Sequence, residues 1–455
     1  MSRLIALAAG LLACSSPKPN FADGAPARDA PAVPCEDEGY AECDGDELER
    51  CETYAWADEA HCGSCRTGCD ADRLCVAAAC RVPDVAQAAL GAGHSCVRTT
   101  SGHVLCWGHN NQGQLGDGRY DDVAFAYDRA DAVAVLGLDD ATAIDLGGYT
   151  SCAIRGAEGA VECWGENRPA HFGPSSDAAP LYVRPEPLLG ASEQVREVSV
   201  AGSHVCVLTQ TEVLCAGNNF TGALGRADPN VRTTVLGPME GLPPAETPRS
   251  LTTGGAGHTC VAMSNGRVYC AGACDWGQCG QTDAPNVFTT EEVAGLTNIV
   301  SVAAGPTFTC ALDDAGAVWC WGSNTSGELG NGSVGGSTGT PARVVGLPPV
   351  HSIAAGNDFV LAVTERRDEV WGWGEAGSGQ LGRGASMLSD TGTPVRILGA
   401  ASVTYDIAAG GSHACILEHE GSAARLLCAG SNQHSALGGW TESSATTYEP
   451  VLAIP

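Results

Sequence analysis

The sequence predicts an all-β protein, a seven-bladed β-propeller that follows a small N-terminal disulfide-rich module. The first observation is a short motif that occurs seven times, at 106–116, 163–173, 215–225, 270–280, 320–330, 372–382 and 428–438. The second is its period of about 50 residues, which is typical of propellers and solenoids, because such a unit buries its apolar face only against its neighbours. The third is the absence of any long segment with the periodicity of a helix.

Each repeat is interpreted as several short antiparallel strands. A short alternating run precedes a turn such as 264–266 (SNG) or 314–316 (DAG), and a second run leads into the motif. Asparagine, aspartate and glycine suit such turns because they tolerate positive φ angles. Small antiparallel sheets repeated around an axis form a propeller, which leaves few strand edges exposed.

The first 34 residues predict export and attachment to a membrane. Residues 1–14 contain Arg3 and then an apolar run that suits a signal peptide but is too short to span a bilayer. Residues 11–14 (LLAC) resemble a bacterial lipobox, so we expect Cys14 to be lipidated. Residues 15–34 are rich in proline, alanine and serine, and this composition indicates a flexible linker.

Residues 35–83 form the predicted cysteine-rich module. Its part 35–80 contains eight cysteines and is too short for a large core, so disulfides are the expected scaffold. Eight cysteines allow roughly a hundred pairings, and the sequence does not choose among them. A zinc knuckle formed by Cys62 and Cys65 with Cys75 and Cys80 is the alternative. The acidic stretches match no EF-hand spacing, and calcium binding stays an open question.

The propeller, expected at 84–455, contains 14 further cysteines whose spacing predicts seven disulfides. Six pairs flank hairpins, so the partners would face each other on antiparallel strands. The sixth repeat has Leu361 and Gly372 in the two equivalent positions, so both cysteines are missing together, as expected of bonded partners. The seventh pair lies within the fourth motif. The expected pairs are Cys96 with Cys106, Cys152 with Cys163, Cys206 with Cys215, Cys260 with Cys270, Cys310 with Cys320, Cys415 with Cys428, and Cys274 with Cys279.

The motif C-[WA]-G-x-N-x-x-G-x-L-G at this period resembles the repeat of the regulator of chromosome condensation family over about 84–455. The resemblance implies a seven-bladed propeller. The family's founding member is a nucleotide exchange factor for the small GTPase Ran. We do not expect that activity here, because the export signal separates the chain from the GTPase and no basic tail is present. Bacterial relatives include inhibitors that grip β-lactamases with one propeller face, which implies a binding role.

The two ends of the repeat region are predicted to meet. Residues 450–455 (PVLAIP) resemble 343–348 (RVVGLP), and 84–91 resemble the segment that follows, 349–356. The pieces at the two ends together make up one repeat length. We therefore expect both ends to share one blade and to lock the ring.

The composition argues against several kinds of chemistry. The formal net charge is −29 and Lys18 is the single lysine, so nucleic acid would be repelled. The sequence contains no phosphate loop, no zinc-protease helix and no nucleophile elbow, so we expect no catalytic residues, no cofactor and no metal.

Histidines and tryptophans recur at the repeat period. Phenylalanine replaces histidine in two repeats, at Phe308 and Phe359, which favours a structural role for the histidines. The tryptophans are expected to anchor the core. The recurring residues are His94, His204, His258 and His413, and Trp107, Trp164, Trp321 and Trp373.

Segments that depart from the repeat are candidates for function, because inserted loops gather on one propeller face. The longest insertions are expected at 117–140, 174–188 and 226–248. In the first, Tyr120, Phe125 and Tyr127 are the candidate binding residues, since aromatic side chains among aspartates suit a basic or carbohydrate ligand.

The predicted function is noncatalytic binding of a protein partner, or scaffolding, at the cell envelope. We expect a monomer held to the membrane through its lipid alone, at the outer membrane or cell surface rather than the inner membrane. A polysaccharide-binding or adhesive surface module is the first alternative, and an enzyme at the propeller mouth is the second. The sequence does not identify the ligand.

Overall fold

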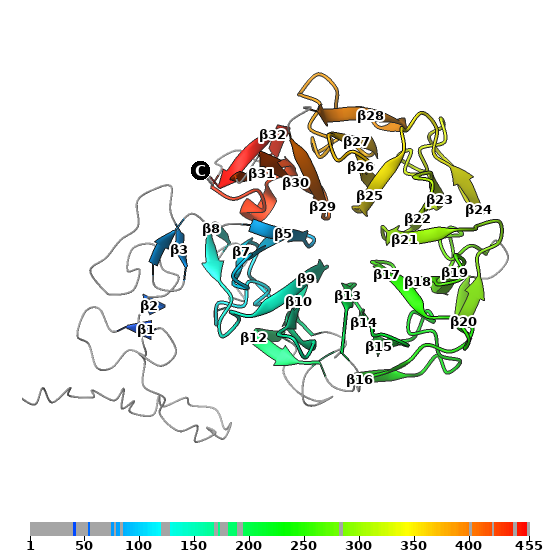
Figure 1. Ribbon diagram of the computed structural model, residues 1–455, viewed down its shortest axis with the longest axis horizontal. Helices are drawn as coiled ribbons and strands as arrows, with labels where there is room; N and C mark the ends of the chain where they lie inside the picture. The colour runs from blue at the N-terminus through cyan, green and yellow to red at the C-terminus, as the bar shows by residue number, and fades with distance from the viewer. Residues whose placement is uncertain are drawn as a thin grey trace, which may run out of the picture. The chain divides into compact units, whose positions relative to one another are not determined.

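The computed structural model describes residues 40–41, 53–54, 74–76, 79–81, 85–119, 128–167, 172, 181–188, 194–281, 285–399, 403–420, 423–439 and 444–452. The chain divides into two units, Met1–Pro83 and Asp84–Pro455. Seven four-stranded antiparallel sheets make up the second unit and stand around a common centre (Figure 1). The prediction of an all-β, seven-bladed propeller is therefore confirmed.

The blades are numbered 1 to 7 in chain order, and in each the first strand lies nearest the centre (Figure 1). Blade 1 consists of β5 (Val85–Leu90), β6 (His94–Thr99), β7 (Val104–Gly108) and β8 (Arg129–Ala134). Blade 2 consists of β9 (Ala141–Gly147), β10 (Thr150–Arg155), β11 (Ala160–Glu166) and β12 (Leu181–Pro187). Blade 3 consists of β13 (Glu197–Val200), β14 (His204–Leu208), β15 (Val213–Asn218) and β16 (Arg232–Pro238).

Blade 4 consists of β17 (Pro248–Gly254), β18 (His258–Met263), β19 (Val268–Ala273) and β20 (Asn286–Glu292). Blade 5 consists of β21 (Ile299–Ala304), β22 (Phe308–Asp313), β23 (Val318–Ser323) and β24 (Ser337–Arg343). Blade 6 consists of β25 (Val350–Ala355), β26 (Phe359–Thr364), β27 (Glu369–Gly374) and β28 (Thr391–Gly399). Blade 7 consists of β29 (Thr404–Ala409), β30 (His413–Glu420), β31 (Ala423–Ser431), the short 3-10 turn η2 (Gln433–Ser435) and β32 (Ser444–Leu452).

The first unit contains two short strand pairs among its described residues. β1 (Tyr40–Ala41) pairs with β2 (Thr53–Tyr54), and β3 (Leu74–Val76) pairs with β4 (Ala79–Arg81). The second pairing places the backbone of Cys75 opposite that of Cys80. The four-disulfide scaffold of this module stays a prediction, because its other cysteines lie outside the described residues.

The motif asparagine shapes the connection between the third and fourth strands. In five blades its side-chain oxygen accepts a hydrogen bond from the backbone N–H five residues later, at 2.8 to 3.1 Å, and the residues are Asn110, Asn167, Asn219, Asn324 and Asn432. In blade 4, Cys274 and Cys279 occupy these two positions and form a disulfide. A covalent bond therefore replaces the hydrogen bond in that turn.

The other six disulfides cross the hairpin between the second and third strands of every blade except blade 6. Their Cα atoms lie 4.1 to 4.2 Å apart. The bonds join Cys96 with Cys106, Cys152 with Cys163, Cys206 with Cys215, Cys260 with Cys270, Cys310 with Cys320, and Cys415 with Cys428. With the bond in the blade 4 turn, the pairing of all 14 propeller cysteines matches the one expected from their spacing.

Blade 6 fills the space of the missing disulfide with apolar side chains. Leu361 lies opposite Gly372, at the two positions that hold cysteines in the other blades. A Cβ on Gly372 would lie 2.6 Å from Ile397 and 3.1 Å from Leu361. A larger residue at position 372 would therefore displace the ends of these side chains, and apolar packing takes the place of the covalent bond.

The motif tryptophans are fully buried and join neighbouring blades. Each indole N–H donates to a motif carbonyl of the preceding blade at 2.8 to 2.9 Å, and the pairs are Trp107–Ala436, Trp164–Gln114, Trp321–Gln278 and Trp373–Glu328. Blade 7 has Ala429 in place of tryptophan. There the hydroxyl of Tyr448, from the fourth strand, donates to the equivalent carbonyl of Gln380 at 3.0 Å. The aromatic contact is therefore kept although its residue comes from another strand.

The expectation that both ends of the chain share one blade is wrong. β5 pairs with β6 in blade 1, and the four strands of blade 7 all come from residues after 403. The repeat length was correct, but the sequence pattern did not show at which strand each sheet begins. Blade 7 instead packs beside blade 1, where Ser95 donates to Ala436 O at 2.7 Å and Gly411 N donates to Gly91 O at 3.0 Å (Figure 1).

The interpretation of 117–140, 174–188 and 226–248 as inserted loops is also wrong in part. These segments contain the fourth strands β8, β12 and β16. A fourth strand packs on the blade with few fully buried residues, as in β12, which has none. Its apolar alternation is therefore too weak to recognise.

Candidate functional site

Two kinds of loop share one end of the propeller. Because neighbouring strands in each blade run antiparallel, the connection from the first to the second strand and that from the third to the fourth emerge at the same end. Thr221 of blade 3 and Gly257 of blade 4 confirm this placement, since the Thr221 hydroxyl donates to Gly257 O at 2.8 Å. The seven motifs lie here, so we call this end the motif face.

Exposed apolar side chains concentrate on the motif face. Phe220 is 59% exposed and Trp276 is 45% exposed, and they lie in the equivalent loops of blades 3 and 4. Of the eight large apolar side chains exposed among the described residues, six lie in loops of this face: Tyr149, Phe220, Trp276, Val334, Met387 and Leu388. The other two, Val235 and Val345, lie in or just after a fourth strand.

A group of carboxylates lies on the same face in blades 5 and 6. Burial raises the pKa of Asp358, and the charge of Asp390 raises it further. Burial likewise raises the pKa of Glu375, with contributions from both aspartates. Backbone N–H groups hold two of the carboxylates in place, because Ala376 N donates to Asp390 at 3.1 Å and Ser326 N donates to Glu328 at 2.8 Å. The motif face therefore combines apolar side chains with acidic groups.

A central channel of about 550 Å³ runs between the first strands of the blades. Asp145 and Glu197 line it, and burial raises the pKa of each to about 7. Asp145 accepts from Val200 N at 2.7 Å, and Glu197 accepts from Leu251 N at 3.3 Å. Each carboxyl thus links the first strand of its blade to that of the next.

The recurring histidines also join blades. Each Nε2 lies 2.9 to 3.0 Å from a hydroxyl of the next blade, in the pairs His94–Ser151, His204–Thr259, His258–Thr309 and His413–Ser95. Each hydroxyl donates to a backbone carbonyl, so it accepts from the imidazole. Ser–His pairs can form a nucleophile and its base. These pairs are completely buried, and their hydroxyl hydrogens are already used, which suits a structural role.

Burial lowers the pKa of these histidines, to about 3 for His94 and His258 and about 4 for His204 and His413. Between pH 6.5 and 4 the unfolded chain therefore binds protons that the folded chain does not, and stability falls as pH falls. Asp145 and Glu197 have the opposite effect on stability. Their raised pKa makes the folded chain bind more protons than the unfolded chain below pH 7, so they favour folding as the pH falls. The partly solvated channel moderates that effect.

His258→Phe removes one buried imidazole, so the free energy of unfolding is expected to fall less steeply as the pH is lowered. Phenylalanine fills this position in blades 5 and 6, so we expect the fold to accept it. Between pH 6.5 and 4, the loss of folding free energy on acidification should decrease by about 1.4 kcal/mol per pH unit, the value for one proton. Urea unfolding at several pH values measures it. Asp145→Asn is the control and should steepen the same profile. An unchanged slope in His258→Phe would contradict the role assigned to the buried imidazole.

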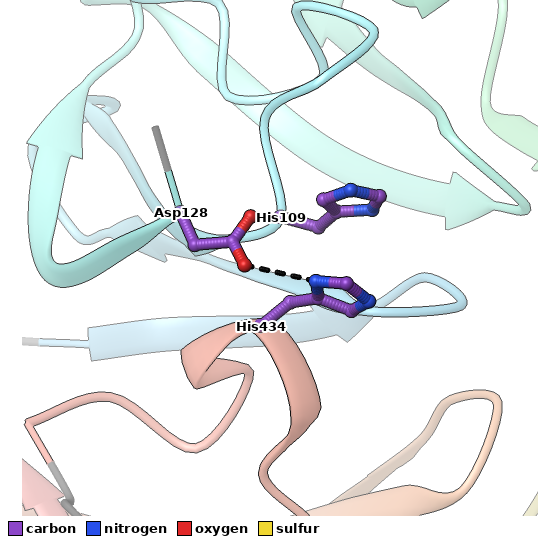
Figure 2. A group of neighbouring side chains, drawn as sticks. All are labelled: His109, Asp128 and His434. Atoms are coloured by element: carbon purple, nitrogen blue, oxygen red, sulfur yellow. Dashed lines mark hydrogen bonds and ion pairs between the residues drawn. The ribbon is translucent and has the colours of Figure 1, made fainter. Parts of the chain in front are cut away.

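One further cluster joins the first and last blades on the motif face (Figure 2). His109 follows β7, Asp128 precedes β8, and His434 lies in η2 of blade 7. His434 Nδ1 lies 2.8 Å from an Asp128 carboxylate oxygen, and the rings of His109 and His434 stack with centroids 3.9 Å apart. Burial lowers the pKa of His109, and His434 lowers it further while Asp128 raises it. One donor atom from each residue lies within 4.8 Å of the other two.

Sequence reasoning missed this cluster. Residue 434 lies 306 positions from Asp128, and neither histidine belongs to the recurring set. The predicted binding residues Tyr120, Phe125 and Tyr127 lie outside the described residues, as does the predicted lipidation site, Cys14. The described residues include no helix with the length and apolar character needed to cross a bilayer.

The fold and the motif face define a seven-bladed propeller that presents apolar and acidic loop residues at one end. A family model of the RCC1-like domain matches residues 52–398, so the chain belongs to the RCC1-like domain family. Arabidopsis thaliana UVR8, an ultraviolet-B receptor, is 27% identical over 65% of this chain and 66% of its own. Human HERC6 is 28% identical over 61% of this chain, which spans only 26% of that relative's length.

Solved structures agree on the fold. Human WBSCR16 superposes with a TM-score of 0.66 at 20% identity, over 77% of this chain and 94% of its own. Yeast RCC1 (Prp20), solved bound to Kap60, superposes with a TM-score of 0.61 at 18% identity, over 78% of this chain and 86% of its own. At these identities the likeness concerns the fold alone.

Proposed function

We propose that this protein is a noncatalytic binding protein that recognises a protein partner through the motif face. The observation that carries the proposal is the gathering there of six of the eight large apolar side chains that are exposed in the described part of the chain. Large apolar side chains gathered on one face beside polar groups favour a protein-interaction site over an ordinary surface. The carboxylates around Asp358 add negative charge, so the partner should present apolar and basic groups.

Two solved structures of one similar protein, yeast RCC1 (Prp20), support a protein partner. Yeast RCC1 was solved bound to Kap60, and yeast Prp20p was studied for binding to Gsp1p and histones. Those partners belong to the yeast protein. What we transfer is the use of a propeller of this family to bind proteins, and the partner here follows from the surface chemistry of this chain.

The proposed place of action is the cell envelope. The signal sequence and Cys14 in its lipobox support export and lipidation, and the linker 15–34 would let the propeller reach partners away from the membrane. Tyr120, Phe125 and Tyr127 remain proposed contributors, because they lie in the chain between β7 and β8, a connection of the motif-face type. Mass spectrometry of the mature N-terminus tests the lipid on Cys14.

The test of binding compares two double variants of the full chain. Phe220→Ser with Trp276→Ser removes two apolar side chains from the motif face, and Val235→Ser with Val345→Ser removes two exposed ones elsewhere. In pull-downs from envelope extract, the first variant should lose at least about tenfold of the captured partner protein, because exposed aromatic residues dominate interface energies. The second should capture as much as the unaltered chain.

Equal capture by both double variants would contradict the assignment of the motif face. Capture of glycan without protein would instead favour the polysaccharide-binding alternative. Both variants change only exposed side chains, so thermal melting should stay within a few degrees of the unaltered protein, which shows that any loss of capture concerns binding rather than folding.

A further inference from the structure

We propose that His109, Asp128 and His434 form a binding site for a divalent transition-metal ion of the zinc class, which clips blade 7 to blade 1. Two imidazoles and one carboxylate supply three donor atoms within 4.8 Å of one another. Figure 2 shows the Asp128 carboxylate pointing to His434, with the His109 ring stacked alongside. Two histidines and a carboxylate around a metal with one further open position is a recurrent zinc arrangement.

The His109 ring provides an independent observation. His109 is 6% exposed, and its Nδ1 is buried without a hydrogen-bond partner among the residues that the structure describes. A buried ring nitrogen without a partner costs free energy and needs an explanation. A metal ion bound between the three side chains would give this imidazole a ligand role and satisfy the site.

The chemistry of the donors selects the kind of ion. Imidazole nitrogen suits zinc, copper, nickel and cobalt, whereas calcium and magnesium prefer sets of oxygen atoms. Tetrahedral zinc with bonds of about 2.0 Å places its ligand atoms about 3.3 Å apart. The 2.8 Å contact between His434 and Asp128 would have to open slightly. The rings of His109 and His434 are stacked with 19° between their planes, so binding of one ion requires one imidazole to rotate until both ring nitrogens point to it.

An arginine beside the cluster would oppose a cation, but it is paired with a carboxylate. Arg129, the residue next to Asp128, pairs with Asp117 at 3.7 Å. His434 also lines a hollow of about 150 Å³ on the motif face, together with Tyr149, Ser412 and Gln433. This hollow gives access to the His434 side of the cluster, whereas His109 and Asp128 do not line it.

The position of the cluster predicts what the metal does. Blades 1 and 7 contain the two ends of the propeller and have no shared sheet, so hydrogen bonds and packing alone hold them together. An ion bound to two residues of blade 1 and one of blade 7 would close the ring over that junction. Binding to the folded chain alone raises its stability by mass action.

The test is titration of the metal-stripped, oxidised full chain with zinc, followed by calorimetry and thermal melting. His109→Ser and His434→Asn remove the two imidazoles. Serine occupies the position of His109 in blades 5 and 7, and asparagine tolerates the φ of +65° found at His434. We expect each variant to lose the one-to-one zinc site, with affinity lowered at least about tenfold. At 100 times the dissociation constant, zinc should raise the melting temperature of the unaltered chain by about 3 °C.

The control is His351→Asn, which removes an exposed histidine on β25 and should bind zinc like the unaltered chain. Cobalt gives a second readout, because its visible absorption bands should appear in the unaltered chain and be absent in His434→Asn. The proposal would be overturned if the unaltered chain bound no zinc. It would also be overturned if both histidine variants bound zinc with the same stoichiometry and affinity as the unaltered chain. Asp128→Asn serves where a histidine variant fails to fold, and unchanged zinc affinity in it would have the same meaning.

Discussion

Reduction of the propeller disulfides is expected to leave the chain unable to refold in water. The six hairpin bonds close loops between cysteines 9 to 13 positions apart, and the seventh joins Cys274 to Cys279. In the chain-entropy model each hairpin bond contributes about 2–3 kcal/mol. Their sum, about 12–18 kcal/mol, is as large as the net stability of about 5–15 kcal/mol that folded domains have.

The measurement is refolding by dilution from urea, with and without reductant, followed by tryptophan fluorescence. All 14 cysteines are buried, so a reductant added to the folded protein should act slowly. A single pair offers a graded test, because Cys260→Ala with Cys270→Ala should cost about 3 kcal/mol. Refolding of the reduced chain to native fluorescence would show that packing alone suffices, as it does for the Leu361–Gly372 pair of blade 6.

Trp321→Ala is expected to be the most damaging single substitution, at about 3–5 kcal/mol of unfolding free energy. The side chain is completely buried between blades 4 and 5. Its indole N–H donates to Gln278 O at 2.9 Å. The alanine variant therefore loses apolar burial, creates a cavity and removes one donor from that carbonyl.

Trp321→Phe separates these contributions, because it keeps most of the ring volume and loses the indole donor. It should cost clearly less than Trp321→Ala in urea unfolding. Trp276→Ala is the matched control, since that side chain is 45% exposed and its loss should change stability by less than about 0.5 kcal/mol. Equal costs for Trp321→Ala and Trp276→Ala would contradict the role of the motif tryptophan as a contact between blades.

The sequence predicted the features that depend on contacts within one repeat. Cys310 and Cys320 lie opposite each other because a tight hairpin brings them together, and the same local argument applies in five other blades. The recurring tryptophans were predicted to be core residues, and all four are buried. Tyr448 was missed, because it lies on a fourth strand that departs from the motif.

Predictions from the sequence were wrong where the repeat did not show at which strand a blade begins, and where the apolar alternation of a strand was weak. The repeat length allowed the sheets to be divided at any strand, and only the pairing of β5 with β6 decided that each blade is continuous in the chain. The fourth strands of blades 1 to 3 were interpreted as loops because one side of each faces solvent. The pairing of β12 with β11 identifies such a segment as a strand.

The sequence by itself determined the number of blades, the disulfide pairs of the propeller and the core positions of its aromatic residues. These follow from periodicity and short-range geometry, which repeat at fixed spacing along the chain. Only the tertiary structure decided how the ring closes, which end gathers the exposed apolar residues, and that His109 and Asp128 meet His434. Those features depend on residues hundreds of positions apart, whose proximity is produced by the curvature of the whole ring and is recorded in no local pattern.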